Sequence, residues 1–248
     1  MNTLYIIFVI ILGAIMGSFY ACMGYRIPNK ISLVKPNSFC DNCKKELKWY
    51  MNIPLFSYIF LKGKCAYCKS KIEVLGFVVE VLTSLLFLLF YLKYGFSTVS
   101  IIGFILTSVL AVTIISDIKY YYISDRVIMI SLICLLLTLY FSYPFKLFLY
   151  YVFSGVFMFL VFLFIKLFGD KIFKKESLGG GDIKLALVIG LSLGIYPSMV
   201  SLLIASVLAL IYSFIILKNK KDALIPFGPF LIGGAVIVLY FISFFKNL

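Results

Sequence analysis

The chain contains no histidine, and only ten of its 248 residues are aspartate or glutamate. Histidine is the side chain that most often serves as a general base in hydrolases, and no convincing triad built on serine or cysteine stands out. A glycine-rich nucleotide-binding loop is also absent from the sequence. Several enzyme classes are thereby excluded, and hydrolysis at neutral pH would have to use carboxylates or a metal ion.

Charged residues make up 13% of the chain, whereas 63% of the residues are apolar and the mean hydropathy is +1.11. A soluble domain is only about half apolar. We therefore expect an all-α polytopic membrane protein with about eight transmembrane helices, in which the longest apolar run divides near Gly194 and Pro197. The first run is too long for a signal-peptide core, so no cleavable signal sequence is expected. Runs near the roughly 20 residues that cross a bilayer occupy 3–25, 94–116, 127–145, 147–165, 185–217 and 223–245, with one more at 74–92.

The net charge of +13 comes from 23 lysines and arginines, of which 20 fall in four loops on one side of this arrangement, at about 26–73, 117–126, 166–184 and 218–222. Lysine and arginine concentrate in cytoplasmic loops of membrane proteins. The distribution therefore predicts an orientation in the cytoplasmic membrane with both termini outside, and it indicates no nucleic-acid partner. The sequence leaves the oligomeric state open.

Residues 26–73 form the only sizeable polar segment, and so short a domain rarely folds on its own core. Two Cys-x-x-Cys pairs lie within it, with 21 residues between them, a spacing close to that of structural zinc sites. In a reducing cytoplasm four thiolates on a metal are favoured over two disulfides. We predict a zinc-stapled cytoplasmic domain between the first two helices, with the ligands Cys40, Cys43, Cys65 and Cys68.

Carboxylates near the apolar runs are the candidate catalytic groups. An ionisable residue there costs free energy, so its presence indicates a functional role. Asp182 follows three glycines and precedes Lys184, and Asp117 ends an apolar run on the same predicted face. Asp182 has a structural alternative, because an aspartate before a helix can cap it, and this reading suits Asp125 in particular. Asp117 is harder to explain in this way, because a helix C-terminus disfavours negative charge. Glu80 lies inside a predicted span, where it either anchors the structure or contacts a ligand.

Two neighbouring aspartates cannot both ionise easily, so one pKa rises and the pair shares a proton. One carboxyl can then activate a water molecule while the other protonates the scissile carbonyl group. Asp117 and Asp182 are thus predicted to form an aspartic-protease dyad at the membrane edge.

The two aspartate motifs resemble those of the type IV prepilin peptidases, and the resemblance covers nearly the whole chain. Other segments in the same order also resemble the family. They are Gly17-Ser18-Phe19, Tyr25-Arg26 with Pro28, the paired cysteines, Asn52-Ile53-Pro54-Leu55 with Ser57-Tyr58, Glu80, and Pro226-Phe227-Gly228-Pro229-Phe230.

The resemblance implies an enzyme that removes the basic leader of prepilins or pseudopilins and then N-methylates the new terminus with S-adenosylmethionine. Asp117 and Asp182 would be catalytic, Gly179 and Gly181 would be the glycines of the Gly-x-Gly-Asp motif, and Asp125 would have a supporting role, as would Lys184 and Glu80. The chain departs from the family pattern in the methyltransferase half, where Ala21 and Leu75-Gly76-Phe77 replace the usual residues. No residues for the methyl donor can be assigned from the sequence.

The expected organisation is a first transmembrane helix at 1–25, a four-cysteine zinc knuckle in a methyltransferase-like region at 26–73, and a transmembrane peptidase domain at 74–248. Two other functions fit parts of the sequence. One is an ion-coupled transporter that uses the membrane-edge carboxylates, although the halves of the chain show no self-similarity. The other is a zinc-stapled scaffold that recruits cytoplasmic partners.

Overall fold

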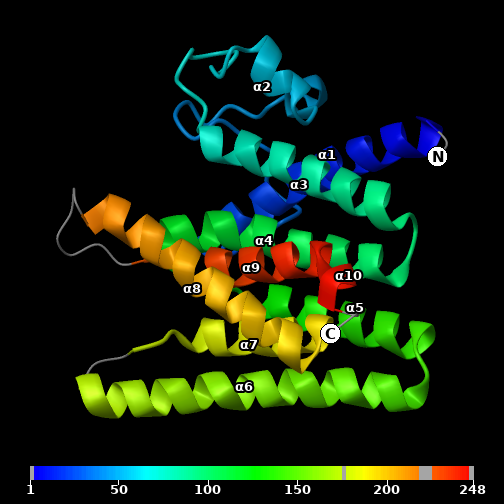
Figure 1. Ribbon diagram of the computed structural model, residues 1–248. Coiled ribbons are helices and arrows are strands. Elements are labelled where there is room, and N and C mark those ends of the chain that lie inside the picture. The colour runs from blue at the N-terminus through cyan, green and yellow to red at the C-terminus, as the bar shows by residue number, and fades with distance from the viewer. Residues whose placement is uncertain (1–2, 175–176, 218–224, 246–248) are drawn as a thin grey trace.

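The computed structural model describes residues 3–174, 177–217 and 225–245, and the chain is helical through most of these ranges (Figure 1). The described residues form no β-strand. They contain only two isolated bridges, Phe39–Glu46 and Lys64–Lys71, both in the segment 27–73 that carries the four cysteines and is called the cysteine segment below. Eight long or medium helices form the body: α1 (Thr3–Arg26), α3 (Val74–Tyr94), α4 (Thr98–Tyr120), α5 (Asp125–Ser142), α6 (Phe145–Phe173), α7 (Gly180–Leu193), α8 (Ile195–Leu217) and α9 (Gly228–Tyr240). Three short elements complete it, η1 (Trp49–Asn52), α2 (Phe56–Phe60) and α10 (Ile242–Phe245).

Six of the helices in the described ranges, α1, α3, α4, α5, α6 and α8, are long and apolar enough to cross a membrane. The longest apolar run divides as expected, because Gly194 adopts φ 83° between α7 and α8. However, α7 has 14 residues and α9 has 13. At about 1.5 Å per residue they are shorter than a hydrocarbon core of about 30 Å. Six of the eight expected spans therefore have spanning length.

The predicted loop at 166–184 is wrong in its first part, because α6 continues to Phe173. Charged residues such as Lys166 and Asp170 favour a solvated linker when only the sequence is considered. A helix can instead extend past the membrane surface with its charged side chains in water, since its backbone hydrogen bonds are satisfied internally. The predicted basic loop at 218–222 lies outside the described residues.

The most buried helix is α4, with 61% of its most apolar stretch inside the protein against 22–33% for the other five spanning helices. It packs against α1, α3, α5 and α9. Along the α1–α3 contact small residues allow a close approach: a Cβ added to Gly13 or Gly17 would lie 2.7 or 2.8 Å from a Cα of α3. The helices are stacked in Figure 1 from α6 on one side to α1 and α3 on the other.

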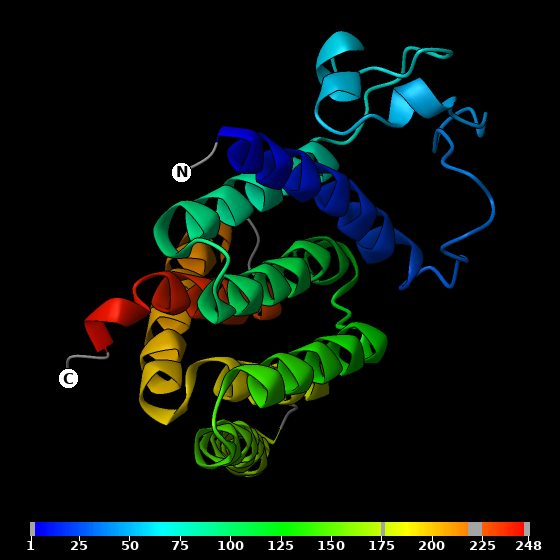
Figure 2. The ribbon, with the colours of Figure 1, turned by 90° about the vertical axis from the view of Figure 1, so that its right-hand side faces the viewer.

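Contacts between helix ends show which helix termini lie at the same end of the body. At one end, the rings of Tyr25 and Tyr120 lie 6.4 Å apart, which joins the C-termini of α1 and α4. At the other end, the side chains of Lys93 and Tyr94 both donate to the carbonyl oxygen of Tyr240. Figures 1 and 2 show the segment 27–73 standing apart from the helical body, beside the first turn of α3. The end of α4 and the starts of α5, α7 and α9 therefore meet on the side that carries the cysteines.

Candidate active site at the helix termini

Asp117 lies in the last turn of α4 and is only 5% exposed. The helix stops there because Tyr121 adopts a left-handed conformation, φ 50°, and its N–H donates to the carbonyl oxygen of Asp117 at 3.0 Å. Such a residue reverses the chain after a helix. The reversal leads within four residues to the start of α5 at Asp125.

The carboxyl group of Asp117 is held by the start of α9. Its Oδ2 accepts a hydrogen bond of 3.0 Å from the backbone N–H of Gly228. The residues before this glycine, Pro226 among them, lie outside the helix, as expected for a chain that enters a helix after a proline. A helix N-terminus stabilises negative charge through its free N–H groups. A carboxylate at a helix C-terminus, where charge is disfavoured, thus gains a compensating partner.

Asp182 lies in the first turn of α7, ahead of the apolar stretch that begins at Leu185, and is 8% exposed. The helix is capped by Gly179, and the carboxyl group of Asp182 reaches back toward that residue's backbone. Asp182 is therefore not the N-cap residue, although one of its oxygens lies beside the backbone of the residue that is. The other oxygen, Oδ1, is buried and has no hydrogen-bond partner in the described part of the chain. A buried acceptor without a partner costs free energy, so capping alone does not explain this residue.

The two aspartates are electrostatically coupled. Burial raises the pKa of Asp182 to about 7, and the charge of Asp117 contributes to the rise. Ile123 packs between the two sites: a Cβ added to Gly181 would lie 2.7 Å from its Cβ, and one added to Gly228 would lie 3.0 Å from its Cδ1. Only a residue without a side chain fits at position 181 while α7 keeps this approach.

Lys184 and Asp125 form an ion pair of 2.6 Å between the first turns of α7 and α5. Both side chains are about half exposed, at 47% and 66%, so the pair is worth little in stability. Asp125 is not the helix cap: Ser124 holds that position, without a side-chain capping bond. The carboxylate instead faces the lysine of the aspartate motif, which aligns the two helix starts beside the buried pair.

The four predicted cysteine ligands come together. All four sulfur atoms lie within 4.8 Å of one another, and those of Cys40 and Cys68 are 3.8 Å apart. A tetrahedral zinc ion with Zn–S bonds of about 2.3 Å separates its sulfurs by about 3.8 Å, so the cluster fits zinc. A hydrogen bond with the Ser70 hydroxyl lowers the pKa of Cys68 to about 6, the direction that favours the thiolate that a metal requires, whereas the pKa of Cys43 in the same cluster is raised to about 11.

The two Cys-x-x-Cys turns have the same hydrogen bonding. The N–H of Lys44 donates to the carbonyl oxygen of Cys40 at 2.8 Å, and that of Lys69 donates to Cys65 at 3.1 Å. Both lysines have a positive φ, 57° and 61°. Each knuckle thus presents two sulfurs from a tight turn, and the pairing of the two turns builds the cluster.

Glu80 is placed with the cysteine segment and not with the aspartates. Its Oε2 accepts the backbone N–H of Leu55 at 2.7 Å. Leu55 has φ 64° and ψ −53°, and the residues on its two sides, Phe56 and Pro54, share a hydrogen bond of 2.7 Å. This is the rare strained form of the γ-turn. The carboxylate of α3 therefore fixes a strained turn of the cysteine segment, which supports the anchoring alternative.

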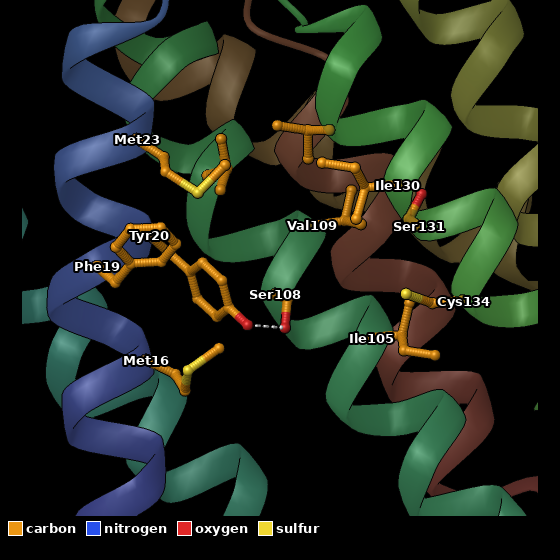
Figure 3. Close-up of a pocket in the computed structure, with 12 residues that line it drawn as sticks. Met16, Phe19, Tyr20, Met23, Ile105, Ser108, Val109, Ile130, Ser131 and Cys134 are labelled. Atoms are coloured by element: carbon orange, nitrogen blue, oxygen red, sulfur yellow. Dashed lines mark hydrogen bonds between the residues drawn. The ribbon is translucent and has the colours of Figure 1, made fainter. Parts of the chain in front are cut away.

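An apolar cleft of about 300 Å³ lies between α1, α4 and α5 (Figure 3). Its main polar groups are satisfied: the hydroxyls of Tyr20 and Ser108 are hydrogen-bonded at 2.8 Å, and Ser131 donates to a carbonyl of its own helix. Figure 3 shows Tyr20 reaching from α1 toward Ser108 on α4. The cleft offers apolar surface on the helix pair whose ends carry Asp117 and Asp125. The sequence patterns do not reveal it, because each lining residue resembles ordinary helix packing.

The backbone N–H of Gly228 is the second feature that sequence reasoning missed. From the sequence, the segment Pro226-Phe227-Gly228-Pro229 predicts only an extended or kinked entrance to a helix. The sequence signal that could have indicated this contact is the glycine between two prolines. The structure explains the glycine, because a Cβ at this position would lie 3.0 Å from Asp117 Oδ2.

Comparison with known proteins gives two family matches that together cover most of the chain. Residues 104–214 match the model of the type IV leader peptidase family, and residues 11–94 match that of the bacterial peptidase A24 N-terminal domain. The "Prepilin leader peptidase/N-methyltransferase" of Vibrio cholerae serotype O1 is 31% identical, over 97% of this chain and 98% of the relative.

Two further relatives extend this likeness. The "Type 4 prepilin-like proteins leader peptide-processing enzyme" of Escherichia coli O78:H11 is 30% identical, over 94% of this chain and 93% of its own length. The "Prepilin leader peptidase/N-methyltransferase" of Bacillus subtilis is 29% identical, over 92% of this chain and 90% of its own length. No solved structure matches the chain.

Proposed function

Because the chain belongs to the type IV leader peptidase family, we propose that it removes the basic leader peptide of type IV prepilins or pseudopilins by an aspartyl mechanism. The observation that carries the proposal is the buried pair Asp117 and Asp182. The pair is assembled from the end of α4 and the start of α7, with the start of α9 completing it. Terminal turns are a poor place for an ion path through the membrane, so the transporter alternative is disfavoured.

The different surroundings of the two aspartates suggest different roles. Asp117 has the N–H of Gly228 on one oxygen, which stabilises its ionised form. Asp182, whose pKa is raised to about 7 by burial, can carry a proton near neutral pH. Asp117 would take a proton from water while the water oxygen bonds to the scissile carbonyl carbon and Asp182 protonates the carbonyl oxygen. Collapse of this intermediate breaks the C–N bond, and a proton passes to the departing amine.

The charge distribution supports a cytoplasmic active site. The helix ends around the dyad adjoin the cysteine segment, which is the most basic part of the chain, and basic segments stay in the cytoplasm. With α7 and α9 counted as additional short crossings, the chain passes the membrane eight times and both termini lie outside. The substrate would then present a polar leader to the cytoplasm and its apolar part to the bilayer.

The second proposed activity is N-methylation of the new terminal residue, because the relatives are named as N-methyltransferases. S-adenosylmethionine would be the methyl donor. In the cysteine segment, zinc would have a structural role. All four positions of a tetrahedral ion would be filled by sulfur, and a zinc ion that acts on a substrate keeps one position open.

The test is cleavage of a prepilin-like substrate by the intact protein and by Asp117→Asn and Asp182→Asn, with mass spectrometry of the new N-terminus. Both variants should insert normally and fail to cleave. Asp170→Asn is the matched control, because the carboxylate of Asp170 bonds Ser177 near the end of α6 and is not part of the dyad. Cleavage by the dyad variants at the parental rate would refute the aspartyl mechanism. A methylated product, about 14 daltons heavier, would establish the second activity in the same spectrum.

A further inference from the structure

A second cavity, of about 510 Å³, lies between the C-terminal half of α1 and the loops of the cysteine segment. Its volume is in the range of small-molecule sites, about 300–1,000 Å³. Unlike the apolar cleft, it has a charged side chain and amide groups beside its aromatic rings. It is lined by Ser18, Phe19, Cys22, Arg26, Leu33, Val34, Pro36, Asn37, Ser38, Leu47, Trp49 and Asn52.

Arg26 is the charged residue of this cavity, and it is 5% exposed. Its guanidinium group donates to the carbonyl oxygens of Ser32 at 2.8 Å and Asn37 at 3.3 Å. No carboxylate pairs with it among the residues that the structure describes. A guanidinium has five N–H donors, and a buried charge is costly without an opposite charge. The cavity therefore has a buried cation with donors to spare for an anionic group.

Trp49 supplies an aromatic ring to the wall of the same cavity. It is 79% exposed, although it belongs to the cavity wall, and Tyr50 packs against it edge to face. An exposed tryptophan is also expected where a protein rests on a membrane interface. A flat aromatic face beside a cavity, however, is the surface on which a nucleobase stacks.

We propose that this cavity is the binding site of the methyl donor S-adenosylmethionine, with Arg26 at the carboxylate of its methionyl part and Trp49 at its adenine. The inference rests on the proposed function, because the need for a methyl donor comes from it. The donor supplies a methyl group on a sulfonium sulfur; the accepting amine loses one proton, and the carbon–sulfur bonding pair stays on sulfur.

The position of the cavity suits a reaction that follows cleavage. Phe19 lines both this cavity and the apolar cleft. The cleft in turn includes Val112 of α4, which lies five residues before Asp117 on the same helix. An N-terminus released at the aspartates would thus reach the donor along α1 without leaving the protein surface.

The experiment uses Trp49, the only tryptophan of the chain, as a reporter. S-adenosylmethionine is titrated into the full-length protein in lipid nanodiscs, Trp49 fluorescence is recorded, and binding is measured in parallel by equilibrium dialysis of the tritiated donor. We expect a saturable fluorescence change with the same affinity as dialysis gives. Arg26→Gln should weaken binding roughly ten-fold or more, since hydrogen bonds to charged groups are the strong ones. Arg126→Gln is the matched control, since Arg126 is the only other arginine and is exposed.

A second pair of variants keeps the inference testable if loss of Arg26 disturbs the fold. By dialysis, Trp49→Ala should weaken binding roughly five-fold or more and Trp49→Phe should retain most of it, because stacking requires a ring. Unchanged affinity in Trp49→Ala, or binding that leaves the fluorescence unaltered, would overturn the proposed site. So would an intact protein that cleaves a prepilin but binds no donor, and the peptidase function would stand. An intact protein that neither cleaves nor binds refutes the proposed function together with this inference.

Discussion

Replacing Asp182 with asparagine should abolish cleavage and at the same time make the protein more stable above neutral pH. Burial raises the pKa of Asp182 from 3.8 to about 7. A carboxyl group whose pKa is raised by folding binds its proton more tightly in the folded state. Its contribution to stability is fully present below the unfolded pKa of about 4 and is lost as the pH rises to about 7. The parent should therefore lose stability across this window.

The size of the effect follows from the shift in pKa. Each unit corresponds to about 1.4 kcal/mol, so the ionised form of Asp182 costs the folded protein up to about 4 kcal/mol above pH 7. Asparagine has a similar shape and carries no charge at any pH, so the variant avoids this cost. Asp117→Asn should give part of the same gain, because the charge of Asp117 is the second cause of the raised pKa.

Thermal unfolding of the detergent-solubilised protein at pH 4 to 9 measures the difference. Comparing parent and variant at each pH cancels the titration of every other group. The midpoint of Asp182→Asn should exceed that of the parent at pH 8 by several degrees, and the gap should close as the pH falls toward 4. A variant that is less stable than the parent at pH 8 would mean that Asp182 is a structural cap, and the catalytic reasoning would fail.

Three further predictions concern the glycine beside Asp182, the metal in the cysteine segment and the contact of Glu80 with that segment. Gly181→Ala should lower the rate of cleavage roughly ten-fold or more, because the added Cβ would lie 2.7 Å from Ile123. The control is Gly180→Ala, whose added Cβ would meet no atom within 4 Å, and this variant should cleave at the parental rate. Elemental analysis should find one zinc ion per chain, and its removal by a chelator should make the segment 39–71 sensitive to protease while the helices persist. Glu80→Ala should lower stability by about 1–3 kcal/mol by leaving the N–H of Leu55 unpaired, and Glu80→Gln should lose less. Protection of the cysteine segment at parental levels in Glu80→Ala would contradict the anchoring role.

Much of the fold is readable from two features of the sequence, the apolar runs and the residues that interrupt them. The break at Gly194 was predictable because a glycine followed by a proline three residues later divides a run too long for one crossing. The cysteine cluster was predictable because the two pairs have zinc-like spacing within one polar segment. In each case the deciding residues lie near one another along the chain.

The errors arose where a helix does not end where its apolar residues end. Lys166 and Asp170 mark the edge of the apolar run, but α6 continues past them to Phe173. Conversely, α9 begins only at Gly228, well inside the apolar run that starts at 223, because Pro226 delays it. Hydropathy reports contact with lipid, whereas the length of a helix also depends on backbone hydrogen bonding and on proline.

The two aspartates of the active site can be recognised in the sequence, whereas the backbone N–H that binds Asp117 cannot. Carboxylates are conspicuous in a chain with only ten acidic residues, so Asp117 and Asp182 stand out from the sequence alone. The group that holds Asp117 is a backbone N–H, which every residue except proline carries, and it lies 111 residues away. What can be read at that position is the lack of a side chain, since any Cβ on Gly228 would press on the carboxylate. A glycine flanked by prolines at the entrance to a buried helix is therefore a sign of a close backbone approach, and in this protein the approach is to an aspartate.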